Sequence, residues 1–261
     1  MSWDPAQYLR FEDQRLRPAV DLLARVALPA PRTVVDLGCG AGNVTALLAA
    51  RWPDADIVGV DNSDAMLEQA RAAAAARPRV RFETGDLATW APAAPADLVY
   101  SNAALHWLPA HAQVFARAIA MVREGGALAV QMPDNFGAPS HTAIAELATS
   151  PRWRARLAPL VRAAPVARPA DYYGWLAPHA ATVDVWTTEY LQVLAKSASG
   201  EHPVAAWTKG TWLVPFMAAL DAGAQREFLA EYDARLAHAY PPLPDGRVLF
   251  PFRRLFIVAN R

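Results

Sequence analysis

A glycine-rich turn between two apolar segments limits the folds that this chain can adopt. Residues 33–61 read TVVDLGCGAGNVTALLAARWPDADIVGVD. The apolar stretches 33–37 and 55–61 are typical of buried parallel strands, and residues 43–51 favour a helix. Glycines at 38, 40 and 42 allow a sharp turn that brings backbone N–H groups close to a ligand at the N-terminus of the helix. The segment therefore predicts half of a nucleotide-binding α/β sheet.

The same alternation of strand and helix continues to residue 132 and then breaks. The expected strands are 33–37, 55–61, 80–86, 97–101, 127–132, 182–194 and 249–259. The expected helices are 18–27, 43–51, 64–76, 109–122 and 140–148, with largely helical sequence at 203–239. Alternation of this kind indicates an α/β fold with a doubly wound, mostly parallel sheet and right-handed crossovers. The later strands, with helical material between them, predict a cap on the same sheet.

Composition narrows the class of protein. Apolar residues make up 54% of the 261 residues, so a sizeable core is expected. The formal net charge is zero, which argues against a nonspecific nucleic-acid binder or a binder of anionic membranes. Cys39 is the only cysteine, so neither an intrachain disulfide nor a cysteine zinc cluster is expected, and we predict no metal. Without a secretory signal or a membrane-spanning run, a cytoplasmic location is expected.

The spacing of the turn does not fit a dinucleotide. The dinucleotide-binding pattern requires G-x-G-x-x-G, and here the third position is Asn43 after Gly38 and Gly40. An acid, Asp36, also precedes the glycines and would repel a pyrophosphate. An NAD-dependent oxidoreductase is therefore disfavoured.

Three acids instead stand at or near the carboxyl ends of the first three strands, where open α/β sheets bind ligands. Asp36 would attract an ammonium group, Asp61 is placed to accept hydrogen bonds from a ribose diol, and Asp86 is placed to bind the exocyclic amine of adenine. A ligand with an amino acid, a ribose and an adenine but no phosphate fits all three, and S-adenosylmethionine is such a ligand. Asp86 alone has a structural alternative, because it could cap the turn TGDLA.

These motifs resemble those of class I S-adenosylmethionine-dependent methyltransferases. DLGCGAG is similar to the glycine-rich signature of that family, and GVDNSDAML and FETGDLATW resemble the motifs that follow it. The resemblance implies that Gly38, Gly40, Asp61 and Asp86 contact the cofactor and that Leu87 lies near the adenine. It also implies a Rossmann-like sheet of seven strands with a helical cap.

The stretch DLVYSNAALHWLP, at 97–109, resembles the fourth motif of small-molecule methyltransferases. In that motif Asn102 follows the strand that faces the methyl group, so we count it among the cofactor contacts. His106 could act as a general base for a phenol or hydroxyl acceptor. The alternative, which we favour, is a structural or positioning histidine near the acceptor.

Nearly the whole chain resembles the trans-aconitate 2-methyltransferase family. The resemblance is carried by WDPAQYLRFEDQRLRPAVDLL at the start, VQMPDNFGAPSH at 130–141, VWTTEYLQVL at 185–194, WTKGTWLVPF at 207–216 and FPFRRLFIVANR at 250–261. It implies a lid segment at 1–17 in which Gln7 and Tyr8 close over the cofactor. It further implies a cofactor-binding α/β core at 18–132, and core strands with an inserted cap that forms the acceptor site at 133–261.

The family resemblance implies monomethyl esterification of trans-aconitate, a small polycarboxylate. A carboxylate is already ionised at neutral pH and needs no base, but it needs cations or hydroxyls to hold it. We expect Arg254, Lys209 and Tyr190 to anchor carboxylates, although each residue has a purely structural alternative. Esterification of a malonyl group on acyl carrier protein, a phenol O-methyltransferase using His106, and a non-catalytic S-adenosylmethionine-binding module remain open. The oligomeric state stays unknown.

Overall fold

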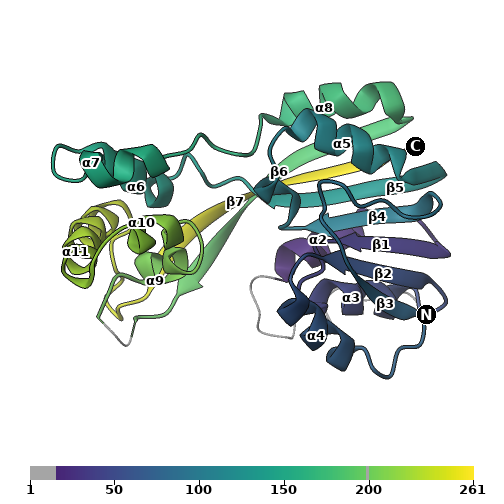
Figure 1. The fold of residues 1–261 in the computed structure, drawn as a ribbon, viewed down its shortest axis with the longest axis horizontal. Coiled ribbons are helices and arrows are strands. Elements are labelled where there is room, and N and C mark those ends of the chain that lie inside the picture. The colour runs from purple at the N-terminus through teal and green to yellow at the C-terminus, as the bar shows by residue number, and fades with distance from the viewer. Residues whose placement is uncertain (1–15, 198–199) are drawn as a thin grey trace. The chain divides into compact units, whose positions relative to one another are not determined.

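The computed structural model describes residues 16–197 and 200–261, so the predicted contacts of Gln7 and Tyr8 lie outside the described residues. Figure 1 shows how the elements follow one another along the chain. The strands are β1 (Thr33–Leu37), β2 (Asp56–Asp61), β3 (Val80–Thr84), β4 (Ala96–Asn102), β5 (Val122–Pro133), β6 (Thr182–Leu194) and β7 (Val248–Asn260). The α-helices are α2 (Arg17–Ala24), α3 (Asn43–Arg51), α4 (Asp64–Ala73), α5 (His111–Ala120), α6 (Pro139–Thr149), α7 (Arg154–Leu157), α8 (Pro169–Leu176), α9 (Pro203–Lys209), α10 (Val214–Ala218) and α11 (Ala222–Ala239). Short 3-10 helices are η1 (Leu105–Trp107), η2 (Ala158–Leu160) and η3 (Ala177–His179).

The chain divides into two compact units. Unit 1 comprises Met1–Pro133, Pro165–Thr188 and Arg254–Arg261, and unit 2 comprises Asp134–Ala164 and Glu189–Arg253. Strands β6 and β7 therefore contribute residues to both units. Within the described part of the chain, no helix is both long enough and apolar enough to cross a membrane.

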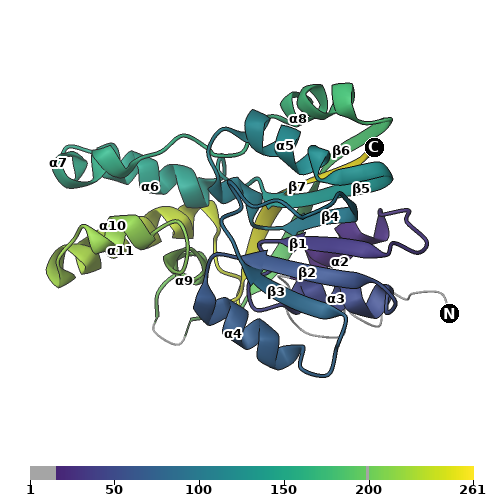
Figure 2. The ribbon, with the colours of Figure 1, turned by 45° about the vertical axis from the view of Figure 1, so that its right-hand side comes forward.

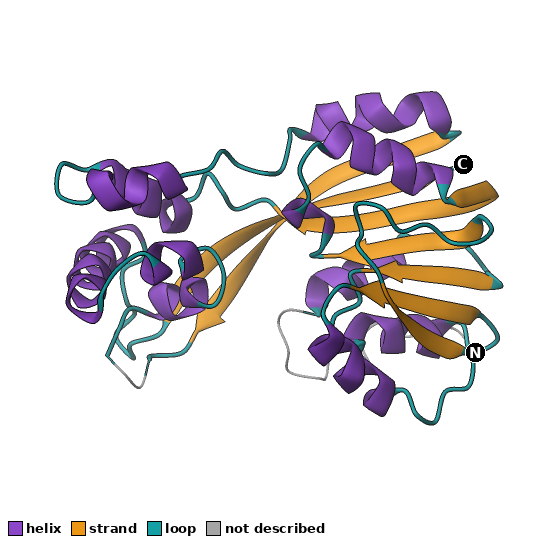
Figure 3. Cartoon of the chain, viewed as in Figure 1, coloured by secondary structure: helices purple, strands orange, loops and turns teal. Residues whose placement is uncertain are grey.

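The sheet has the order β3-β2-β1-β4-β5-β7-β6. Strands β1 to β5 pair in parallel, and β7 runs antiparallel to β5. In unit 1, helices α2, α3 and α4 lie on one side of this sheet and α5 and α8 on the other (Figures 1 and 2). Figure 3 shows the strands in orange between these helices. The predicted doubly wound, mostly parallel sheet of seven strands is confirmed. The strand order reverses between β1 and β4, which is where such sheets bind ligands.

Local sequence signals explain where several elements begin. Ser63 caps α4, because its Oγ accepts a hydrogen bond from the backbone N–H of Met66 at 3.4 Å. Helix α8 was not predicted, although Pro169 occupies its first turn and the carboxylate of Asp171 accepts a hydrogen bond from the backbone N–H of Arg168 at 3.1 Å. Both signals stand in a proline-rich segment, and they mark a helix of only 8 residues.

Unit 2 has an apolar core of its own. Helix α11 contributes Phe228, Tyr232 and Leu236 to this core, all three with no exposed surface. The hydroxyl of Tyr232 donates a hydrogen bond to the backbone oxygen of Ser140 at 2.7 Å, and this bond ties α11 to α6. The core and this bond together make unit 2 a packed body rather than a set of loops.

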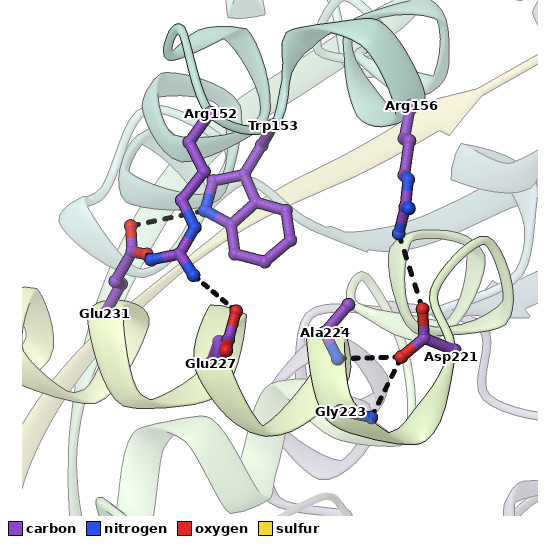
Figure 4. Close-up of polar contacts among 8 residues, drawn as sticks. All are labelled: Arg152, Trp153, Arg156, Asp221, Gly223, Ala224, Glu227 and Glu231. Carbon is purple, nitrogen blue, oxygen red and sulfur yellow. Dashed lines mark hydrogen bonds and ion pairs between the residues drawn. The ribbon is translucent and has the colours of Figure 1, made fainter.

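A network of charges joins the segment before α7 to α11 on the surface of unit 2 (Figure 4). The guanidinium of Arg152 donates to carboxylates of both Glu227 and Glu231, the latter at 2.8 Å. The indole N–H of Trp153 donates to the other oxygen of Glu231 at 3.2 Å. The guanidinium of Arg152 also lies 4.9 Å from the centre of the Trp153 ring. One arginine thus links two turns of α11 to the neighbouring segment.

Candidate functional site

The turn between β1 and α3 is shaped by three glycines in left-handed conformations. Gly38, Gly40 and Gly42 have φ angles of +77°, +52° and +83°, which residues with a Cβ rarely adopt. A Cβ at Gly38 would lie 2.1 Å from the Cβ of Ala104, so the segment after β4 packs directly on the turn. A Cβ at Gly40 would meet no described atom within 4 Å. The turn therefore leaves room for a ligand beside Gly40.

Asp61 ends β2 and holds the glycine turn in place. Its Oδ2 accepts a hydrogen bond from the backbone N–H of Gly40 at 2.9 Å, and its Oδ1 accepts one from the backbone N–H of Ser63 at 3.0 Å. An ionised carboxylate offers about four acceptor positions. Two positions remain, and they are sufficient for the two hydroxyls of a ribose. The geometry fits the predicted ribose contact.

Asp36, the acid before the turn, is buried and close to Asp61. It is 1% exposed, and its Oδ2 accepts a hydrogen bond from the hydroxyl of Thr45 at 2.6 Å. Burial raises the pKa of Asp36 to about 7; the hydroxyl of Thr45 lowers this pKa and the charge of Asp61 raises it further. A nearby cation would favour the ionised form of such a carboxyl. The position suits an ammonium group and disfavours a phosphate.

Asp86 follows β3 and has the capping role that the sequence left open. Its Oδ1 accepts a hydrogen bond from the backbone N–H of Ala88 at 2.8 Å. Its backbone oxygen accepts one from the backbone N–H of Trp90 at 2.7 Å. The cap occupies only one carboxylate oxygen, so it is compatible with a contact to an adenine amine. Leu87 lies beside the turn, because its Cδ1 would be 3.3 Å from a Cβ at Gly38.

The carboxyl end of β4 lies next to the turn. The hydroxyl of Ser101 donates to the backbone oxygen of Leu37 at 2.8 Å and holds this end of β4 against β1. Ala103 has a φ of +54°, a left-handed conformation that is unusual for a residue with a Cβ and occurs preferentially at functional sites. The Oδ1 atom of Asn102 is buried and has no hydrogen-bond partner among the described residues. Asn102 thus offers an unused polar atom at the expected place.

Arg254 and His106 lie close together in unit 1. Arg254 pairs with Pro133 at the end of β5 and is 6% exposed, so it is buried rather than solvated. His106, on η1, is also 6% exposed. Burial, and then the positive charges of Arg254 and His111, lower the pKa of His106 to about 3. His106 is therefore neutral near pH 7, and within the described part of the chain its Nδ1 has no hydrogen-bond partner.

The remaining predicted anchors lie in unit 2. The ammonium of Lys209 forms an ion pair with Glu201, and Tyr190 is 5% exposed in β6. Arg253, next to Arg254 in sequence, is half exposed and pairs with Asp134 at 2.8 Å. Among the predicted site residues, those of the cofactor pattern, His106 and Arg254 belong to unit 1, whereas Lys209 and Tyr190 do not.

Comparison with known proteins reveals strong sequence similarity. Residues 34–126 match a family model described as a methyltransferase domain. A trans-aconitate 2-methyltransferase of Methylobacterium nodulans is 51% identical over 260 residues, which cover 99% of this chain and 98% of that relative. A trans-aconitate 2-methyltransferase of an Azoarcus species is 48% identical, with 100% and 99% of the two chains covered.

Solved structures share the fold at low sequence identity. YcgJ from Bacillus subtilis has a TM-score of 0.60 at 14% identity, covering 94% of this chain and 98% of its own. Phosphoethanolamine N-methyltransferase 2 of Haemonchus contortus, solved with S-adenosyl-L-methionine, has a TM-score of 0.54 at 14% identity and covers 93% of this chain. The match takes in 52% of the Haemonchus chain. These likenesses concern the fold alone.

Proposed function

This chain belongs to the trans-aconitate 2-methyltransferase family, and from that membership we propose that it esterifies one carboxylate of trans-aconitate or of a close tricarboxylate. The protein is an S-adenosylmethionine-dependent methyltransferase. The products would be the monomethyl ester and S-adenosylhomocysteine. The single structural observation that supports this acceptor is the buried guanidinium of Arg254, at the end of the sheet where Asn102 also lies.

The residues proposed to hold the cofactor stand at the carboxyl ends of β1 to β4. They are Asp36, Gly38, Gly40, Asp61, Asp86, Leu87 and Asn102. The glycines would let the backbone approach the ligand, Asp61 would accept hydrogen bonds from the ribose hydroxyls and Asp36 would hold the ammonium group. When bound, S-adenosylmethionine supplies an electrophilic methyl group, and its transfer to a carboxylate oxygen forms a C–O bond as the C–S bond breaks, without moving a proton.

The task left to the chain is to hold a polyanion and align one oxygen. The planar guanidinium of Arg254 can bind a carboxylate through two parallel hydrogen bonds. Its burial strengthens the attraction, because the surrounding dielectric is lower than that of water. Lys209 and Tyr190 remain proposed anchors. A substrate carboxylate would have to replace Glu201 as the partner of Lys209.

His106 fits a positioning role better than that of a base. A general base works best when its pKa lies near the operating pH, and the pKa of His106 is lowered to about 3. A phenol acceptor would have to give its proton to this weak base. A carboxylate acceptor has no proton to give, so the neutral imidazole is compatible with esterification.

The experiment is an acceptor panel with the wild-type protein and labelled S-adenosylmethionine at neutral pH. We expect labelled monomethyl ester from trans-aconitate. Malonyl acyl carrier protein and a simple phenol are included as the acceptors of the two alternative methyltransferase functions. Label in either of these, with none in trans-aconitate, would overturn the proposal in favour of that alternative. Tight binding of S-adenosylhomocysteine with no label in any acceptor would instead favour a binding module.

A further inference from the structure

Gln131 is a buried glutamine whose side chain has no partner. It lies in β5 with 0% of its surface exposed. Its backbone oxygen accepts a hydrogen bond from the backbone N–H of Ala103 at 2.9 Å. Both polar atoms of the side-chain amide, Oε1 and Nε2, lack a hydrogen-bond partner among the described residues. In native proteins nearly all buried polar atoms form hydrogen bonds. We therefore expect the amide of Gln131 to have a hydrogen-bond partner outside the described residues.

A second buried polar atom without a partner among the described residues, the Oδ1 of Asn102, lies near Gln131. Asn102 stands opposite Gln131 in the register of β4 and β5, so both side chains project from the same face of the sheet. On the other side, β7 pairs Phe256 with Gln131 and Arg254 with Pro133, which puts Arg254 on that face as well. The buried Oδ1 of Asn102 likewise has no partner within the described residues. Two unpaired carboxamides and a buried guanidinium therefore occupy neighbouring strands.

The order of the strands gives each of these groups a place relative to the glycine turn. The turn follows β1, Asn102 ends β4, Gln131 is on β5 and Arg254 is on β7. Neighbouring strands lie about 4.8 Å apart, so Gln131 is displaced from β1 by roughly 10 Å and Arg254 by roughly 14 Å. The carboxamides of Asn102 and Gln131 are therefore closer to the glycine turn after β1 than the guanidinium of Arg254 is.

We propose that Gln131, together with the side-chain amide of the proposed cofactor contact Asn102, binds the reacting carboxylate of the acceptor, whereas Arg254 binds a carboxylate that does not react. This assignment rests on the proposed function. A carboxamide can rotate to present its N–H₂ group, so Gln131 and Asn102 can each donate a hydrogen bond to a carboxylate oxygen. These donors are neutral, and their hydrogen bonds to the carboxylate are weaker than those of a guanidinium. The attacking oxygen therefore keeps more of its electron density.

A carboxamide at position 131 suits an anionic acceptor better than a carboxylate or an apolar side chain would. A glutamate at 131 would repel the anionic acceptor, and a leucine would offer no donor. A leucine would also remove the unsatisfied amide, and replacing such a group by an apolar one of similar shape is neutral or stabilising for the fold. Loss of function combined with retained or raised stability is therefore the signature of a binding role.

The test compares Gln131→Leu and Gln131→Glu with the wild-type protein and with Gln225→Leu. Gln225 is a partly buried glutamine of α11 whose amide donates to the backbone oxygens of Met217 at 2.8 Å and Leu220 at 3.0 Å. We expect Gln131→Leu to raise KM for trans-aconitate at least about tenfold and to keep the Kd for S-adenosylhomocysteine within about twofold. Its melting temperature should be unchanged or higher. Gln131→Glu should lose more activity, and Gln225→Leu should lose stability but no activity.

Three outcomes would each overturn a stated claim. If the wild-type protein esterifies trans-aconitate and Gln131→Leu keeps a wild-type KM and kcat, the inference is wrong and the proposed function stands. An equal loss of S-adenosylhomocysteine affinity and of activity would also overturn it, because Gln131 would then serve the cofactor. If the wild-type protein forms no ester at all, the proposed function fails and the inference fails with it.

Discussion

The carboxylate of Asp61 accepts a hydrogen bond from the backbone N–H of Gly40 at 2.9 Å, and this bond joins the end of β2 to the glycine turn after β1. Gly40 is also the position where an added Cβ would meet no described atom within 4 Å. One side chain thus fixes the backbone beside the open space and keeps about two acceptor positions that no described residue occupies. The bond connects the predicted ribose contact to the shape of the turn.

Replacing Asp61 by alanine should nearly abolish cofactor binding. The substitution removes the proposed acceptor of two ribose hydroxyls and frees the N–H of Gly40. Hydrogen bonds to a charged group contribute about 1.5–3 kcal/mol each, so the Kd should rise at least about 100-fold. Calorimetric titration with S-adenosylhomocysteine measures this change. Binding at near wild-type affinity would show that the ligand lies elsewhere.

Replacing Gly38 by alanine should mainly lower stability, whereas replacing Gly40 by alanine should mainly weaken cofactor binding. Gly38→Ala should lower the free energy of unfolding by about 2 kcal/mol or more, since its Cβ would lie 2.1 Å from that of Ala104. Gly40→Ala should cost about 1 kcal/mol for its left-handed backbone but weaken cofactor binding about tenfold or more. Gly137→Ala is the control, because its Cβ would meet nothing described within 4 Å. Urea unfolding and titration check the three variants, and equal profiles for Gly38→Ala and Gly40→Ala would contradict this account.

Cofactor binding should depend on pH through Asp36. Its folded pKa is raised to about 7, well above the unfolded value, so the folded protein binds more protons between pH 4 and 7. The stability of the ligand-free protein should therefore fall as pH rises through this window. A bound ammonium group favours the carboxylate, so affinity for S-adenosylhomocysteine should fall as pH drops below 7.

Asp36→Asn is the matched variant for this effect. Its melting temperature and its affinity should vary less with pH between 5 and 8 than those of the wild-type protein. Titrations in buffers of different ionisation enthalpy should detect proton release on binding to the wild-type protein below pH 7. Identical pH profiles for the two proteins would show that Asp36 does not titrate on binding.

Arg152 should stabilise unit 2 more than its neighbour Arg156. Arg152 contacts Glu227, Glu231 and the ring of Trp153, whereas Arg156 makes a single 3.5 Å ion pair with Asp221 (Figure 4). Exposed ion pairs contribute about 0–1 kcal/mol each, and networks contribute more. Arg152→Leu should cost about 1 kcal/mol in urea unfolding and Arg156→Leu close to none. A larger loss for Arg156→Leu would contradict the ranking.

Much of the proposed cofactor site could be predicted from the sequence, because its signals are local. Apolar runs and glycine spacing are properties of a few adjacent residues, and β1 and α3 have the predicted bounds, Thr33–Leu37 and Asn43–Arg51. The pattern of three acids depends only on their places at or near the ends of strands. Residues of this kind can be assigned before any packing is known.

The proposed acceptor site was less predictable, because the properties of its residues arise from packing between segments that are distant in sequence. Gln131 is one polar residue in an apolar strand, and only the pairing of β5 with β4 and β7 shows that its amide is buried without a described partner. No local sequence pattern marks Gln131 as a site residue. The low pKa of His106 likewise depends on burial and on Arg254, which is more than a hundred residues away in sequence. The division of the Arg253–Arg254 pair into an exposed ion pair and a buried cation also required the register of β7.

The most direct measurement is the rate of ester formation from trans-aconitate by three proteins: wild type, Arg254→Met and Arg253→Met. The two arginines are adjacent, but Arg254 is buried and Arg253 is exposed and paired with Asp134. Loss of a charge-assisted bidentate contact should lower kcat/KM about 100-fold or more in Arg254→Met. Arg253→Met should stay within about threefold of the wild-type protein. No ester from the wild-type protein, or equal rates for the two variants, would contradict the account.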